Sequence, residues 1–66
     1  MKATVNGTPR DLPGEMTIGA LLEMLGSAPV GIAVARNEQV VPRGDYDRDR
    51  VREGDRIEII TAVAGG

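Results

Sequence analysis

The chain has 66 residues, ten acidic and eight basic side chains, and a formal net charge of −2 at pH 7. It is long enough for one domain with a small core, and it contains no Cys, His, Trp or Phe and a single Tyr. This composition excludes disulfides, Cys or His metal ligands, a histidine general base and an aromatic platform for nucleic-acid bases, and the mild acidity gives no indication of nucleic acid or an anionic membrane as a partner.

The N-terminal part predicts a β-hairpin. Residues 1–5 are β-permissive, and Asn6-Gly7 is a strong two-residue turn signal because both residues tolerate positive φ. Residues 8–12 are the expected return strand. Pro9 favours an edge position for that strand, since proline has no N–H to donate to a neighbouring strand.

A short amphipathic helix is expected next, with Thr17 as its N-cap. Four residues at i, i+3, i+4 and i+7 form one apolar face: Ile18, Leu21, Leu22 and Leu25. Gly26 suits the position just after the helix. Gly19 weakens the helix by roughly 0.5–1 kcal/mol relative to Ala, and one interpretation is that it allows the backbone to pack closely on a sheet.

Two short strands are predicted after the helix. Residues 31–36 alternate larger and smaller apolar side chains, so successive residues point to opposite faces. The turn at Asn37-Glu38 leads into residues 39–41, and Pro42 ends that strand.

The charged segment 44–53 is expected to be a surface connection with at most one helical turn, held down by Tyr46 and Val51. A turn at Gly54-Asp55 then leads into the last strand, residues 56–62. The alternation in this strand decides which of its side chains face the helix.

In the last strand, Ile57 and Ile59 are expected to face the helix, which leaves Ile60 and Ala62 on the open face of the sheet. An exposed apolar spot there is a possible docking surface for a partner, although a single surface isoleucine needs no such explanation. Arg43 either contacts a partner or caps a loop carbonyl.

The element order, β-β-α-β-β with a final strand, favours an α+β protein, because an apolar helix face needs a sheet to cover it. We expect a β-grasp, or ubiquitin-like, fold with a mixed four- to five-stranded sheet packed on one main helix. Its first and last strands would be neighbours. The domain would span residues 1–62, followed by a flexible Gly-Gly tail at residues 63–66.

The last two residues given are Gly65 and Gly66. Because glycine has no Cβ, partner backbone and nucleotide can approach such a tail closely, and residues 62–66 span at most roughly 17 Å when extended. Without His or Cys, the Gly66 carboxylate is the expected reactive group. A frayed chain end is the alternative explanation.

Three segments resemble the ThiS family, the sulfur-carrier proteins of thiamine thiazole biosynthesis: residues 37–43 (Asn-Glu-Gln-Val-Val-Pro-Arg), residues 54–59 (Gly-Asp-Arg-Ile-Glu-Ile) and residues 62–66 (Ala-Val-Ala-Gly-Gly). The resemblance covers essentially the whole chain. One departure is Arg36, where the family usually has an apolar residue. Arg36 is therefore expected at an exposed strand end or beside an acid.

The resemblance implies a carrier protein that is not an enzyme and binds no cofactor or metal. In the family, a ThiF-type enzyme adenylates the terminal carboxylate, here that of Gly66, using ATP and magnesium. A sulfur donor, a persulfide protein, then displaces AMP, and the thiocarboxylate delivers its sulfur to thiazole synthase, ThiG. Four tail residues would enter the partners' active sites: Val63, Ala64, Gly65 and Gly66.

Three other functions remain open from sequence. A MoaD-like carrier would supply sulfur for molybdopterin synthesis, although those chains tend to be longer and richer in Phe. A ubiquitin-like modifier would be joined to target lysines, and a plain β-grasp interaction module would not need its tail. No signal peptide or membrane span is expected, and a cytoplasmic location follows as the default.

Overall fold

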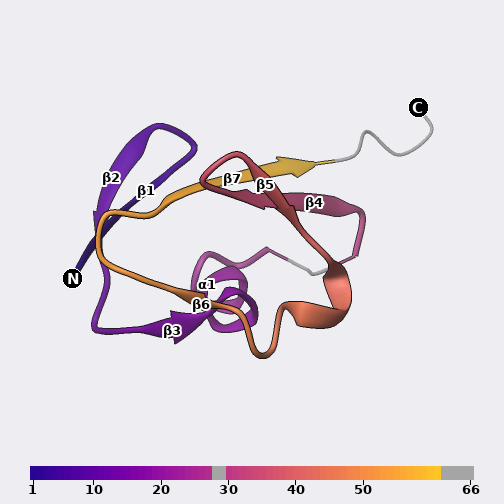
Figure 1. Cartoon of the computed structure of the whole chain (residues 1–66), viewed down its shortest axis with the longest axis horizontal. Helices are drawn as coiled ribbons and strands as arrows, with labels where there is room; N and C mark the ends of the chain where they lie inside the picture. The colour runs from indigo at the N-terminus through magenta and orange to yellow at the C-terminus, as the bar shows by residue number, and fades with distance from the viewer. Residues whose placement is uncertain (28–29, 62–66) are drawn as a thin grey trace.

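The computed structural model describes residues 1–27 and 30–61. One mixed sheet, in the strand order β2-β1-β7-β4-β5, lies over the only α-helix of these residues, α1 (Figure 1). Its strands are β1 (Lys2–Val5), β2 (Thr8–Asp11), β4 (Ile32–Arg36), β5 (Gln39–Val41) and β7 (Arg56–Thr61). The first and last strands, β1 and β7, pair in parallel, and the other pairs are antiparallel. This confirms the predicted β-grasp fold with five strands.

The hairpin β1–β2 forms as the sequence indicates. Asn6 and Gly7 both have positive φ, at 50° and 81°. Pro9 is on β2, an edge strand of the sheet, and lies opposite Thr4 of β1. Leu12, predicted as part of the return strand, lies one residue beyond β2, where its N–H donates to the Met1 carbonyl at 2.7 Å and its side chain is buried.

The helix α1 (Ile18–Met24) begins at the expected N-cap. The Thr17 hydroxyl accepts a hydrogen bond from the Ala20 N–H at 3.0 Å, which satisfies one of the donors left free at the start of a helix. Gly26 has a φ of 74°, the left-handed conformation that ends many helices.

A two-stranded ladder and a 3-10 turn lie in segments that the sequence treats as connections. The strand β3 (Met16–Thr17) pairs antiparallel with β6 (Arg50–Val51), and η1 (Arg43–Asp45) is the single helical turn expected in the charged segment. The ladder was not predicted, because two residues are too few to show a strand pattern. It brings the charged segment against the start of α1.

The core lies between the sheet and the helix. Buried apolar residues come from nearly every element: Ala3, Val5, Leu12, Ile18, Leu21, Leu22, Val34, Val41, Tyr46, Val51 and Ile57. Burying a Leu, Ile or Val side chain contributes about 1.5–3 kcal/mol each. Tyr46 and Val51 are therefore the residues that hold the charged segment to the core, as predicted.

The interpretation of Gly19 as packing on a sheet was wrong. Its N–H donates to the Tyr46 carbonyl at 2.8 Å, and a Cβ at this position would lie 3.3 Å from the same oxygen and 2.7 Å from Asp47 Oδ1. The close approach is therefore to the segment after η1. The absence of a side chain at Gly19 lets this segment lie directly on the first turn of α1.

Candidate functional site

The strand β7 leads towards the predicted tail, and neighbours hold it on both sides. On one side it pairs with β4 along its length, from Arg36 opposite Ile57 to Ile32 opposite Thr61. On the other side it pairs with β1 only at Thr4–Arg56 and Val5–Ile57.

β1 ends at Val5, and beyond it the Asn6 side chain makes the hydrogen bonds to β7 that a longer strand would make. Its Oδ1 accepts from the Ile59 N–H at 2.8 Å and its Nδ2 donates to the Ile59 carbonyl at 3.3 Å. The Asn6 N–H also donates to the Ile57 carbonyl at 2.9 Å. Hydrogen bonds therefore fix β7 almost to its last described residue.

The described residues do not include the predicted docking residue Ala62 or the residues predicted to react or to enter partner sites: Val63, Ala64, Gly65 and Gly66. Their roles, and the boundary between domain and tail at residue 62, stay predictions. The described part of the chain reaches Thr61, which lies opposite Ile32 at the end of the sheet.

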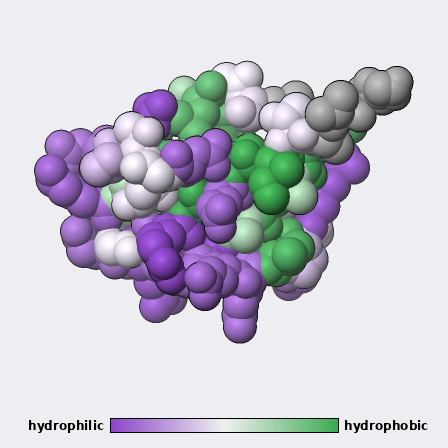
Figure 2. Space-filling model, turned by 90° about the horizontal axis from the view of Figure 1, so that it is seen from above, coloured by the Kyte–Doolittle hydropathy of each residue, from purple (hydrophilic) through white to green (hydrophobic). Residues whose placement is uncertain are grey.

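The face of the sheet turned away from α1 carries an apolar patch, which we call the apolar face: Ala33, Ala35, Val40 and Ile60. Ile60 is 60% exposed and Val40 is 76% exposed. Ala33 pairs with Ile60, and Ala35 pairs with Val40, so these side chains adjoin across three strands. Figure 2, seen from above, shows apolar surface gathered on one part of this side of the molecule.

The predicted position of Ile60 is confirmed, because Ile57 is buried, Ile59 is half-buried and Ile60 is exposed. Sequence reasoning missed Val40, which is exposed on the same face of the sheet as Ile60, two strands away. The available signal was the alternation within β5, where Val41 is buried and Val40 must therefore point outwards.

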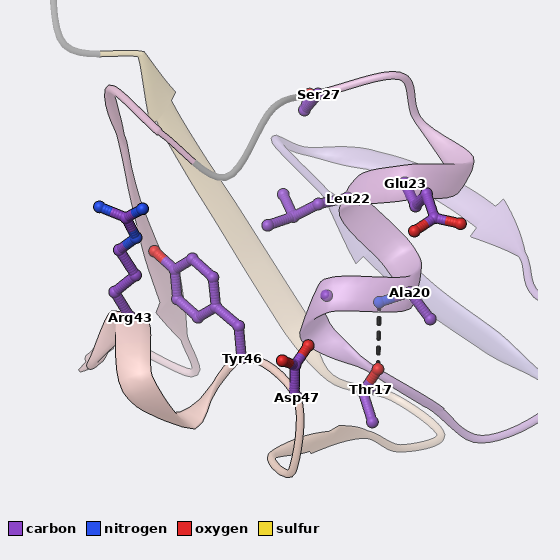
Figure 3. A pocket seen from close by; sticks show the side chains of 9 residues that line it. Thr17, Ala20, Leu22, Glu23, Ser27, Arg43, Tyr46 and Asp47 are labelled. Atoms are coloured by element: carbon purple, nitrogen blue, oxygen red, sulfur yellow. Dashed lines mark hydrogen bonds between the residues drawn. The ribbon is translucent and has the colours of Figure 1, made fainter.

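Arg43 lies elsewhere, in η1. It lines a pocket of about 490 Å³ between α1 and the segment 43–47, together with Leu22, Tyr46 and Asp47 (Figure 3). Within residues 1–27 and 30–61 its guanidinium makes no hydrogen bond, so capping of a loop carbonyl is not seen there. The structure thus places Arg43 on the helix side of the sheet and Ile60 on the other side.

Asn37 and Asp55 join two turns at the start of β7. Asn37 Nδ2 donates to Asp55 Oδ1 at 3.1 Å, and Asn37 Oδ1 accepts from the Arg56 N–H at 2.9 Å. Asp55 Oδ2 accepts from the Arg52 N–H at 2.8 Å. These contacts join the segments 37–43 and 54–59, since each supplies half of a hydrogen-bonded connection.

Arg36 lies beside an acid, as expected for its unusual place in the strand. Its Nη1 is 3.1 Å from Asp49 Oδ1 and donates to the Arg50 carbonyl at 2.7 Å. The guanidinium therefore ties the end of β4 to β6.

Among the described side chains, no group of three or more His, Cys, Asp and Glu is arranged to hold a metal ion. No helix in the described part of the chain is long and apolar enough to cross a membrane.

The model of the ThiS family matches residues 3–66. The chain belongs to the ThiS family. A sulfur carrier protein ThiS from Escherichia coli is 33% identical over 66 residues, which cover the whole of both chains. The crystal structure of a ThiS thiamine biosynthesis protein from Geobacter metallireducens has 32% identity and a TM-score of 0.86, with full coverage of both chains.

Two longer relatives of this ThiS family member are thiazole synthases. Those from Paramagnetospirillum magneticum and Magnetococcus marinus are 39% and 41% identical to it over all 66 residues. The chain spans 20% of the length of each. In these two proteins a ThiS-like segment is therefore part of a chain named for thiazole synthesis.

Proposed function

We propose that this protein is the sulfur carrier for thiazole formation in thiamine biosynthesis. Membership of the ThiS family and the likeness to sulfur carriers over the full chain support this function. In this role the protein is a carrier and co-substrate, and the catalytic groups belong to its partners.

The reacting group in this proposal is the carboxylate of Gly66. A carboxylate is a poor electrophile, so a ThiF-type enzyme would first use ATP and magnesium to form an acyl-adenylate and release pyrophosphate. The sulfur of a protein persulfide would then attack the acyl carbon and displace AMP. Reduction of the resulting S–S bond by a thiol leaves the thiocarboxylate. The carrier itself holds neither the nucleotide nor the metal.

The observation that carries the proposal is the anchoring of β7. Hydrogen bonds from Asn6 and pairing with β4 hold the strand as far as its end at Thr61. Residues 62–66 can extend at most roughly 17 Å from that point. A rigid domain that carries a narrow tail of this length is suited to deliver one carboxyl group to several enclosed active sites.

The apolar face is the docking surface that we propose for the activating enzyme. Its Ile60 lies at the end of β7 from which the tail departs, so one partner can contact Ile60 and Ala62 and receive the tail. Exposed apolar side chains grouped in this way are typical of interaction sites. Arg43 would touch such a partner only where the partner extends past the edge of the sheet to the helix side.

Thiazole synthase is the proposed acceptor of the sulfur. The occurrence of a similar segment within two thiazole synthase chains supports a direct association between carrier and synthase. A cytoplasmic location is part of the same proposal, because the activating step consumes ATP.

Intact mass spectrometry tests the proposed chemistry. The protein is incubated with ATP, magnesium, a ThiF-type enzyme and a persulfide donor, and the Escherichia coli relative serves as the positive control. The expected result is the exchange of one oxygen for one sulfur, located at Gly66 by fragmentation. An unchanged mass, while the control carrier is converted, refutes the proposal. Addition of thiazole synthase and its substrates then identifies the acceptor.

A further inference from the structure

A second surface feature lies at the start of β7, at the opposite end of that strand from the tail. It is a hollow of about 600 Å³, which we call the arginine hollow, and it is lined by Arg36, Asn37, Arg48, Asp49, Arg50, Arg52 and Asp55. Four of the chain's eight basic residues thus lie around one hollow in a protein whose net charge is −2.

The two acids of the hollow already have partners. Asp55 accepts from Asn37 Nδ2 and from the Arg52 N–H, and Asp49 lies 3.1 Å from Arg36 Nη1. Both carboxylates are therefore already used within the protein, Asp49 by an ion pair and Asp55 by neutral donors. With four arginines against these two acids, the lining of the hollow is positive on balance.

Two lining residues have guanidinium groups without a partner among the described residues. Arg48 is paired with Asp45, at 3.0 Å between Nη2 and Oδ1. Arg50 and Arg52 are exposed, and their side chains make no ion pair or hydrogen bond with the other described residues. Only their backbones are used, by Arg36 and Asp55. The planar fork of a guanidinium group matches the two oxygens of a carboxylate.

We propose that the arginine hollow docks a carboxylate-rich segment of the enzyme that adenylates the tail. The inference rests on the proposed function for the identity of this partner. A partner held only at the apolar face could let the carrier turn about its tail. A second contact at the start of β7, about 16 Å along the strand from Ile60 at roughly 3.3 Å per residue, fixes the orientation of the carrier.

The charge pattern favours an acidic protein segment over nucleic acid. Two available guanidiniums, flanked by Asp49 and Asp55, match a short run of carboxylates rather than a long phosphate backbone. The chain's one aromatic residue, Tyr46, is buried and lines the pocket beside Arg43 instead of the arginine hollow, so no base can stack on it. Exposed charges of this kind mainly raise association rates and set orientation.

A peptide titration tests the site directly. Hexaglutamate is added at low salt and the backbone amide shifts are followed, with hexalysine and an oligothymidylate of equal charge to hexaglutamate in parallel. Saturable shifts confined to residues 36–37 and 48–55, and lost in Arg50→Ala/Arg52→Ala, support the proposal. The matched control, Lys2→Ala/Arg10→Ala, removes the same charge from β1 and β2 and should bind as the wild type does. No saturation, equal loss in the control, or tighter binding of the oligothymidylate overturns the site.

Adenylation kinetics test the partner. In Arg50→Ala/Arg52→Ala we expect the KM for the carrier to rise roughly 3- to 10-fold with kcat unchanged, and the difference to close at high salt. An unchanged KM overturns the assignment to the adenylating enzyme. If the wild type itself is not adenylated, both the proposed function and the assignment of this partner are refuted. The peptide titration still decides whether the hollow binds carboxylates.

Discussion

The side chain of Asn6 continues the pairing of β7 where β1 stops, with both of its amide atoms hydrogen-bonded to the backbone of Ile59. A residue selected for a turn, with a φ of 50°, thus also acts as one unit of a strand. It connects the first turn of the chain to the last described strand, 53 residues away.

Replacement of Asn6 should loosen the end of β7. Asn6→Gly keeps the positive φ and removes both side-chain hydrogen bonds, so we expect a loss of about 1–2 kcal/mol in the free energy of unfolding. Hydrogen exchange at the Ile59 amide should quicken more than exchange in β1. Asn6→Asp keeps the acceptor for the Ile59 N–H and should lose less. Equal protection of Ile59 in the wild type and Asn6→Gly would contradict the anchoring role.

Gly19→Ala should lower stability, although alanine is the better helix former. The new Cβ would meet the Tyr46 carbonyl at 3.3 Å, and this backbone atom is held by the Gly19 N–H. We expect a loss of about 1 kcal/mol in urea unfolding. Asp47→Ala should restore little of it, because the exposed Asp47 carboxylate can turn away. An alanine variant more stable than the wild type would show that the segment after η1 adjusts freely.

The connection between Asn37 and Asp55 should contribute to stability through backbone hydrogen bonds. Asp55→Asn turns one acceptor into a donor that faces an N–H group, and we expect a loss of about 1–2 kcal/mol. Thermal and urea unfolding measure this change. Glu53→Gln is the control, since Glu53 accepts one hydrogen bond from Lys2 on the exposed surface and should change stability by less than about 0.5 kcal/mol. Equal losses of stability in Asp55→Asn and Glu53→Gln would contradict this role of Asp55.

The apolar face should affect activation and leave folding intact. Ile60→Gln removes an exposed apolar side chain, so we expect the KM of adenylation to rise about tenfold, which corresponds to about 1.4 kcal/mol. The melting temperature should shift by only a few degrees. Met24→Gln is the matched control, because Met24 is 46% exposed but lies on α1. Equal KM values for the two variants would place docking elsewhere.

The last residue should tolerate no side chain. Gly66→Ala puts a Cβ beside the reacting carbon, so we expect kcat/KM for adenylation to fall tenfold or more, about 1.4 kcal/mol in the transition state. Ala64→Gly lies two residues earlier and should remain close to the wild type. Pyrophosphate release with the ThiF-type enzyme measures both variants, and full activity of Gly66→Ala would argue against a closely fitting site at Gly66.

Much of the fold could be predicted because local patterns and the global architecture agree. The apolar spacing from Ile18 to Leu25 and the turn at Asn6-Gly7 both depend on neighbours along the chain. The same holds for Ile60, whose exposure follows from strand alternation alone. The ladder of β3 and β6 and the reason for Gly19 could not be predicted, because both depend on contact between segments about 30 residues apart.

The sequence by itself determined the order of the helix and the five strands of the main sheet, the β-grasp class, the absence of Cys and His chemistry and the resemblance to sulfur carriers. These properties follow from composition and short-range spacing. Only the tertiary structure decided that Val40 and Ile60 share one face of the sheet, that Arg43 lies on the helix side, that Asn6 anchors Ile59 and that four arginines surround one hollow. Each of these facts depends on register and packing between distant strands, which no local pattern encodes.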